Sequence, residues 1–156
     1  MERRNVVKLG VFGAIAAGVV GVAGRAFAFH RGGGNRGEWM KQRISSRIDA
    51  ALDAASVTGP ARDVVHAERD KVFAAFEKAR SGRKEHMDKA LALFEADTID
   101  KSEIASLRQE RIDRMNEIAD VVETAIVNVH DALDAKQRSA IVAYVKSQRD
   151  RMHGDR

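Results

Sequence analysis

The chain has 156 residues, of which 44% are hydrophobic, only 5% aromatic and 32% charged. This composition is typical of a single domain built from helices with a thin core. Cysteine is absent, which excludes disulfides, cysteine-bound zinc and a thiol nucleophile. The net charge is +4, and the four basic residues and one acidic residue among the first 28 supply +3 of it. The basic balance is therefore no indication of nucleic-acid binding, which needs a clustered basic face.

The first 28 residues have the three parts of a secretory signal peptide. Arg3, Arg4 and Lys8 form a basic start, and an uncharged apolar run of 16 residues follows. Ala26 and Ala28 then supply small residues at the two positions that signal peptidase requires. We expect export to the periplasm with cleavage after Ala28. The alternative is an uncleaved membrane anchor, but a spanning helix needs about 20 strongly apolar residues, and this run contains five glycines.

The export route has two interpretations. Residues 3–8 read RRNVVK, which resembles the twin-arginine export signal of two arginines, any residue, two apolar residues and often lysine. The glycine-rich, mildly apolar run fits that route. An ordinary Sec signal that happens to start with two arginines fits the same residues.

The mature chain is expected to be helical throughout. Residues 29–38 are rich in glycine and predict a flexible tail, followed by one domain over residues 39–156. In that domain apolar residues recur at spacings of three and four, and no segment alternates as a strand would. The pattern predicts helices over about 39–55, 60–80, 84–96, 101–133 and 135–152.

Capping residues mark three of the expected helix starts. Asp100 with Glu103, and Asp134 with Gln137, have the spacing of a capping box, in which the two side chains bond each other's backbone N–H groups. Thr58 stands before a Gly-Pro pair and can cap the helix that follows.

One of these capping segments belongs to a recognisable signature. Residues 133–138 read LDAKQR and resemble the Leu-Thr-x-x-Gln signature of the Spy/CpxP family, which stands twice, at the starts of two helices. Leu133, Gln137 and Arg138 match the family pattern. Asp134 replaces the threonine, and both residue types are good helix caps.

A more degenerate copy lies upstream; in chain order it is the first copy, and residues 133–138 are the second. Residues 57–62 read VTGPAR, so that Val57 stands at the leucine position, Thr58 and Arg62 match, and Ala61 replaces the glutamine. Residues 96–101 (ADTIDK) are also similar to the acidic turn that precedes the long helix of this family. The order of these three motifs extends the resemblance over about residues 40–152.

The resemblance implies an all-α fold: a long, bent, antiparallel helical hairpin of four to five helices that dimerises into a cradle. In the family, the concave face holds partly unfolded envelope proteins without ATP. The residues themselves allow the same interpretation, because narrow apolar stripes on long helices cannot all be buried in one slim monomer. The alternative fold is a four-helix bundle that buries every stripe.

Three functions remain compatible with the sequence. The first is a periplasmic holdase chaperone for unfolded or misfolded envelope proteins. The second is a regulator that restrains a sensor kinase, as CpxP-like members do. The third is a zinc, nickel or cobalt sensor or resistance protein that acts on a two-component or sigma-factor system. No Ser/His/Asp set and no compact carboxylate pair stands out, so we expect no enzymatic activity.

The metal hypothesis has four candidate ligands. Nickel/cobalt sensors of the wider family use His-x-x-x-His spacings, and this chain has none. His66 and Asp70 are four residues apart and share a helix face, so they could bind a metal only together with ligands from elsewhere. His86 and His130 are isolated among charged residues, where a histidine is usually solvated.

Methionines on or beside the stripes have two interpretations. Met40, Met87, Met115 and Met152 could form an adaptable client-binding surface, because the methionine side chain reshapes easily. The alternative, which the sequence favours for any one of them, is that they fill an ordinary core.

Overall fold

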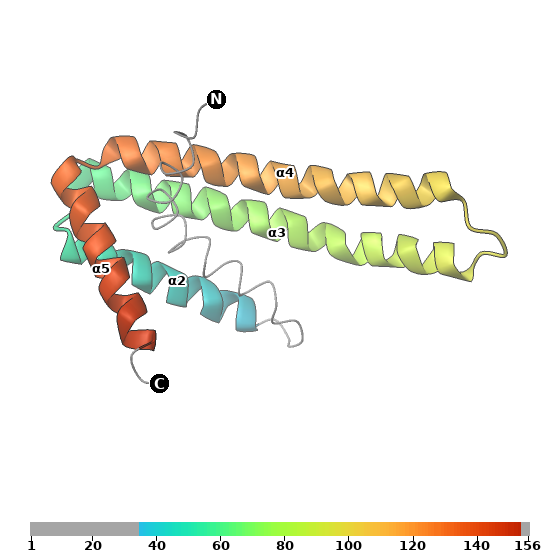
Figure 1. Ribbon diagram of the computed structural model, residues 1–156, viewed down its shortest axis with the longest axis horizontal. Helices are drawn as coiled ribbons and strands as arrows, with labels where there is room; N and C mark the ends of the chain where they lie inside the picture. Colours follow the sequence, from blue (N-terminus) through green and yellow to red (C-terminus); the bar gives the residue numbers. More distant parts are fainter. Residues whose placement is uncertain (1–34, 154–156) are drawn as a thin grey trace, which may run out of the picture. The chain divides into compact units, whose positions relative to one another are not determined.

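A computed structural model of the chain describes residues 35–153, in which four α-helices and no strand are present. The helices are α2 (Asn35–Ala54), α3 (Gly59–Glu95), α4 (Lys101–Ala132) and α5 (Ala135–His153), and short segments connect them (Figure 1). The all-α prediction is confirmed. The expected signal peptide, with Ala26 and Ala28, and the tail residues 29–34 lie outside the described residues. Within the described part, no helix has the length and apolar character needed to cross a bilayer.

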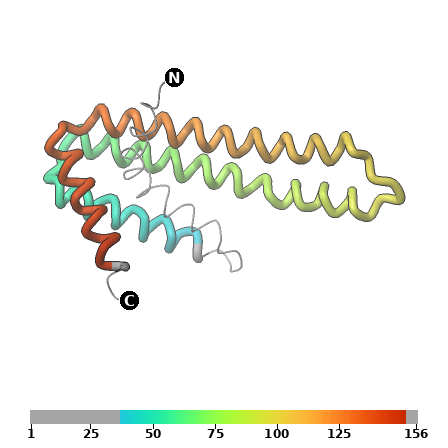
Figure 2. Tube along the Cα trace, viewed as in Figure 1, coloured from blue at the N-terminus to red at the C-terminus, as the bar shows by residue number. Residues whose placement is uncertain are grey.

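The chain divides into two compact units. The first unit comprises α2, the start of α3 up to His66, the end of α4 from Ile126, and α5. The second unit, residues 67–125, consists of the remaining parts of α3 and α4, which run antiparallel as a helical hairpin (Figure 2). Each unit therefore has its own packing, and the candidate sites can be assigned to one or the other.

Two predicted helix boundaries were wrong. The sequence pattern predicts a break near residues 81–83, but α3 runs unbroken through Gly82. A glycine inside a helix costs only about 1 kcal/mol relative to alanine. A Cβ at Gly82 would lie at ordinary contact distance, 3.4 Å, from Nη1 of Arg114 on α4. In addition, α2 begins at Asn35, so the last residues of the expected tail are helical.

The first unit has a compact apolar core. Leu52 and Val57 are its largest fully buried side chains. α2 and α5 pack against each other, and the connections before α3 and before α5 close the core. The buried members are Ala51, Leu52, Ala55, Val57, Val65, Leu133 and Ile141.

The turn after α2 depends on left-handed backbone geometry. Ser56 has φ 53° and Gly59 has φ 60°, a region that L-residues with a Cβ adopt at some cost. The N–H of Val57 donates to the carbonyl of Leu52 at 2.9 Å, which satisfies one of the unpaired carbonyls at the end of the helix. The turn thereby directs Val57 into the core.

The second unit is thin. Its buried apolar residues are Val72, Ile118 and Ala125, and no residue between Phe73 and Glu117 is buried. Ion pairs cross between the helices instead. Lys78 Nζ lies 2.9 Å from Glu117 Oε2. A second ion pair, between Lys89 and Glu110, lies nearer the end of the hairpin. A two-helix layer has no further element to cover its faces, so apolar residues there stay exposed.

Candidate functional site

The second signature copy has a structural role in the first unit. The Asp134 carboxylate accepts a hydrogen bond from the N–H of Gln137 at 2.8 Å, and the Gln137 side-chain oxygen accepts one from the N–H of Asp134 at 3.0 Å. This is the capping box expected from the sequence. Leu133 is only 3% exposed and belongs to the core. The signature therefore starts α5 and anchors the preceding turn.

The arginines of the two copies have corresponding partners. Arg138 donates from Nη1 to the carbonyl of Leu133, and to that of His130 at 3.1 Å. In the first copy, Arg62 Nη1 lies 3.5 Å from the carbonyl oxygen of Val57. In both cases the guanidinium returns to the carbonyl of the apolar residue five positions earlier. The repeat is thus visible in the hydrogen bonds as well as in the sequence.

The first copy also contributes to the core. Val57 is 0% exposed and packs in the same cluster as Leu133. Thr58 is exposed and directly precedes the first residue of α3. Val57 and Leu133, one from each copy, thus contribute to the core of the first unit.

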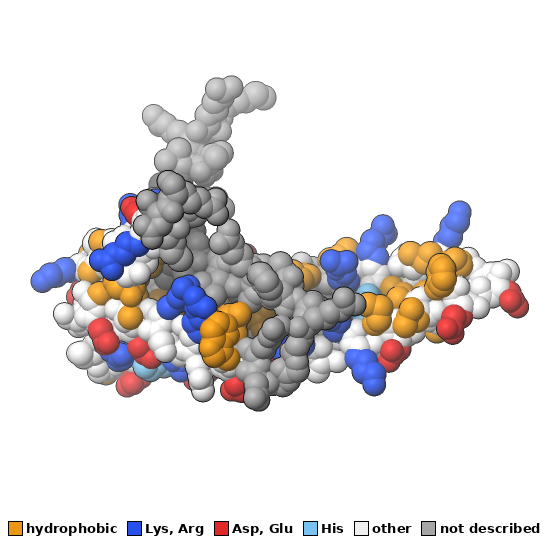
Figure 3. Space-filling view, turned by 90° about the horizontal axis from the view of Figure 1, so that it is seen from below, with side chains coloured by type: hydrophobic (Ala, Val, Ile, Leu, Met, Phe, Trp, Pro, Cys, Tyr) orange, Lys and Arg blue, Asp and Glu red, His pale blue; other side chains and the backbone are white. Residues whose placement is uncertain are grey.

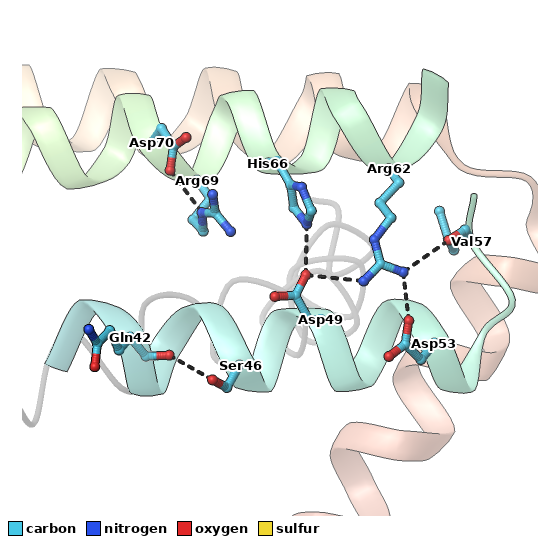
Figure 4. Close-up of polar contacts among 9 residues, drawn as sticks. All are labelled: Gln42, Ser46, Asp49, Asp53, Val57, Arg62, His66, Arg69 and Asp70. Atoms are coloured by element: carbon cyan, nitrogen blue, oxygen red, sulfur yellow. Dashed lines mark hydrogen bonds and ion pairs between the residues drawn. The ribbon is translucent and has the colours of Figure 1, made fainter. Parts of the chain in front are cut away.

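A charged cluster that the sequence analysis missed joins α2 to the start of α3 (Figure 4). Asp49 Oδ1 accepts from Arg62 Nη2 at 3.2 Å and lies 2.7 Å from His66 Nε2. Arg62 Nη1 lies 2.6 Å from Asp53 Oδ1. The hydrogen bond to Asp53, with the charges of both carboxylates, raises the pKa of Arg62. The only signal in the sequence was the i,i+4 spacing of Asp49 and Asp53.

Three of the four proposed metal candidates have hydrogen-bond partners other than one another. His66 bonds Asp49, and Asp70 is bound by its neighbour Arg69 at 2.8 Å. His130 Nδ1 lies 2.9 Å from Asp131 Oδ1. Among the residues that the structure describes, no group of three or more His, Cys, Asp or Glu side chains could hold a metal ion.

His86 lies beside the ion pair between Lys89 and Glu110 that joins α3 to α4. Its Nδ1 is 3.8 Å from Glu110 Oε2, too long for a hydrogen bond, and has no other partner. Lys89 Nζ lies 3.3 Å from Glu110 Oε1 and 3.2 Å from Glu85 Oε1. The hydrogen bond from Lys89 holds the pKa of Glu110 below its ordinary value. With a lysine already on this carboxylate, the His86–Glu110 pair does not fit a metal site.

Large apolar side chains are exposed along the outer half of the hairpin. We call six of them the outer apolar face: Met87, Leu91 and Phe94 on α3, and Ile104, Ile112 and Met115 on α4. Phe94 is the most open, with 82% of its surface exposed. A space-filling view shows hydrophobic side chains gathered on this part of the molecule (Figure 3). The two methionines are therefore surface residues and not core filling.

The six side chains lie on one face of the second unit. On the other face, α3 and α4 enclose a shallow groove of about 650 Å³, whose lining includes Ala75, Lys78, Glu117 and Val121. At 3.6 residues per turn, the apolar stripe of each helix lies roughly 160° around the helix from its groove residues. Since the groove opens on one side of a two-helix layer, both stripes open on the opposite side.

This face has the character of a binding surface. Contiguous exposed apolar surface marks an interaction site in a soluble protein. Methionine and leucine side chains adapt to partners of different shape. The ion pairs between Lys78 and Glu117 and between Lys89 and Glu110 cross between the two helices. Each of the six apolar side chains leaves between 42% and 82% of its surface exposed.

Comparison with known proteins places the chain in a family. A family model described as heavy-metal resistance matches residues 7–140, which is most of the chain. No curated protein and no solved structure matches it. The family groups with Spy/CpxP-like helical folds, although no match to the Spy/CpxP family itself was found. The chain therefore belongs to the heavy-metal resistance family, within the clan of Spy/CpxP-like helical folds.

Proposed function

We propose that the protein is an ATP-independent holdase of the bacterial periplasm, which binds partly unfolded envelope proteins on the outer apolar face. The observation that supports this proposal is the exposure of six large apolar side chains on one face of a two-helix unit. Burying apolar surface contributes roughly 25 cal/mol per Å². Several side chains that are each half covered by a client therefore give weak, reversible binding.

The composition of the surface suits many clients. Leu91, Met87 and Met115 are exposed and have flexible side chains that can adapt to different partners. A client that exposes apolar segments would be shielded from other unfolded chains and released when it folds. No covalent step is needed, and affinity for the native client is low because its apolar residues are buried.

An aggregation assay tests the proposal. The purified chain from Phe29 onward should suppress aggregation of a chemically denatured test protein at near-stoichiometric ratios without ATP. The double variant Leu91→Ser, Phe94→Ser should lose most of this effect and keep its helical circular dichroism. Val127→Ser is the matched control, because Val127 is an equally exposed apolar residue outside the second unit. Full suppression by the double variant would contradict the proposal.

The proposal includes a homodimer, because a cradle built from two hairpins offers a client more surface than one. Sedimentation velocity of the purified chain measures this directly, and a monomer at the concentrations that suppress aggregation would remove the dimer from the proposal. Residues 1–28 are proposed to direct export to the periplasm and to be removed there.

A second candidate function is a metal-responsive envelope regulator, which could act on a sensor kinase or sigma-factor system. The family match to heavy-metal resistance favours it. The described residues bring together only pairs of potential ligands, such as His66 with Asp49, each already bonded to a basic side chain. Calorimetric titration with zinc, nickel and cobalt separates the candidates. Tight, saturable binding without an effect on aggregation would favour the regulator.

A further inference from the structure

Basic side chains are concentrated on the outer apolar face. At 3.6 residues per turn, the basic residues within about 60° of the α3 stripe are Arg80, Arg83 and Lys84, and those within about 60° of the α4 stripe are Lys101, Arg108 and Arg111. Five of these six are exposed, and Arg83 is half-buried. The apolar side chains therefore stand among cationic ones.

Carboxylates avoid the same face. On residues 80–94 of α3, Glu85 and Asp88 lie about a quarter-turn or more from the stripe. On residues 101–115 of α4, Glu103, Glu110 and Asp113 lie more than a third of a turn away. Glu85 and Glu110 are also occupied by Lys89. These two segments hold eight basic and five acidic residues, and the two faces of the hairpin differ in charge.

Most of the exposed basic residues on this face are not paired with a carboxylate among the described residues. Within the described part of the chain, Arg80, Lys84, Arg108 and Arg111 form no ion pair with any carboxylate. Figure 3 shows Lys and Arg side chains mostly along one edge of the outer hairpin and Asp and Glu side chains mostly along the opposite edge. Away from the carboxylates at the end of the hairpin, a partner that covers the apolar side chains would thus meet mainly positive charge.

We infer that the outer apolar face selects acidic polypeptide segments, in which glutamate or aspartate alternates with apolar side chains. This inference rests on the proposed function and specifies its clients. Apolar side chains of the segment would cover Leu91 and Ile112, while its carboxylates would pair with Arg108 and Arg111. Charge complementarity speeds encounter and rejects basic segments, because like charges brought together are costly.

Two other occupants fit less well. A second copy of the same face would bring like charges together, such as Arg108 against the Arg111 of the other copy. An anionic membrane would meet the carboxylates of Glu95, Asp97 and Asp100, which lie at the end of the hairpin beside Phe94. A flexible acidic segment can lie along the cationic part of the face and avoid this turn.

Peptide binding tests the inference. Two fluorescent peptides of equal length and identical leucine and phenylalanine positions would carry glutamates in one case and lysines in the other. Fluorescence anisotropy should show the glutamate peptide binding about tenfold more tightly at low salt, with the difference shrinking as salt rises. Arg108→Gln, Arg111→Gln should abolish the difference. Arg47→Gln, Lys146→Gln, which removes two exposed charges from the first unit, should keep it.

The outcomes separate this inference from the proposed function. Equal affinity for the two peptides, together with normal suppression of aggregation, would overturn the charge selectivity alone. A glutamate preference that survives Arg108→Gln, Arg111→Gln would overturn the assignment to this face. Binding to phosphatidylglycerol vesicles without any peptide preference would assign the face to a membrane and overturn the inference. Loss of binding to both peptides in Leu91→Ser, Phe94→Ser would support the apolar contribution.

Discussion

Arg138 donates a hydrogen bond to the carbonyl oxygen of Leu133, at the turn between α4 and α5. The carbonyls at the end of a helix have no partner within the helix. The guanidinium therefore satisfies groups that would otherwise need water, and its positive charge lies at the negative end of the α4 dipole. Arg62 makes the corresponding contact with the carbonyl of Val57. In both copies the arginine therefore binds a carbonyl in the turn that precedes its own helix.

Leu133→Ala should destabilise the protein strongly. The side chain is buried in the core of the first unit, and truncating a buried leucine costs about 2–5 kcal/mol. Chemical denaturation followed by circular dichroism measures the free energy of unfolding. Val127→Ala, at an exposed position of the preceding helix α4, should change it by less than about 0.5 kcal/mol. Similar values for the two variants would contradict the assigned core.

The capping box should be measurable as a coupled pair. Asp134→Ala removes the acceptor for the N–H of Gln137 and should cost about 1 kcal/mol, the usual cost of losing an N-cap. Gln137→Ala should cost less, because its bond to the Asp134 N–H is the longer of the two, 3.0 Å against 2.8 Å. If the two side chains act together, the double variant will lose less than the sum of the two single losses.

Asp49 should matter more for stability than Asp53. Asp49 is bonded by both Arg62 and His66, whereas Asp53 is bonded by Arg62 alone and is more exposed, 67% against 37% for the side chain. Asp49→Ala should therefore lower Tm by more than Asp53→Ala does. Each variant leaves Arg62 with the other carboxylate, so neither should unfold the chain. An equal shift would mean that the His66 contact contributes nothing.

The hairpin should lose stability in acid. The hydrogen bond from Lys89 lowers the pKa of Glu110 from its ordinary value of 4.5. A carboxyl with a lowered pKa stabilises the folded state above pH 4.5, and this contribution disappears as pH falls through the lowered value. Glu110→Gln should be less stable than the unaltered chain at neutral pH, and the difference should vanish below the lowered pKa. Thermal melts across this range provide the measurement.

Cleavage after Ala28 remains a prediction from the sequence. Mass spectrometry of protein from the envelope fraction should find a chain that begins at Phe29. Replacement of Arg3 and Arg4 by lysine should block export only if the twin-arginine route is used. A full-length product in the membrane would support the anchor instead.

Local signals in the sequence were sufficient for the capping box and for the apolar stripes that carry Met87 and Met115. A capping box involves residues three apart, so the side chains of Asp134 and Gln137 can be placed without knowing the fold. The stripes through Met87 and Met115 likewise followed from spacing along a single helix. In both cases the relevant distance is fixed by helix geometry.

Features that depend on two segments far apart in the sequence could not be predicted. Gly82 resembles a helix break until Arg114 is known to lie across it. The Asp49–His66 contact requires the turn that folds α3 back on α2. The separation of charge on the outer face depends on which side of each helix meets the other. Spacing along one helix cannot supply that information.

The absence of buried side chains between Phe73 and Glu117 has a consequence for how the chain opens. Regions with few buried apolar contacts open locally at a lower free energy than the whole protein unfolds. Backbone amides near Leu91 and Ile104 should therefore exchange with deuterium long before those near Leu52 and Ile141. Proteases should nick the far end of the hairpin first, leaving the two signature turns intact.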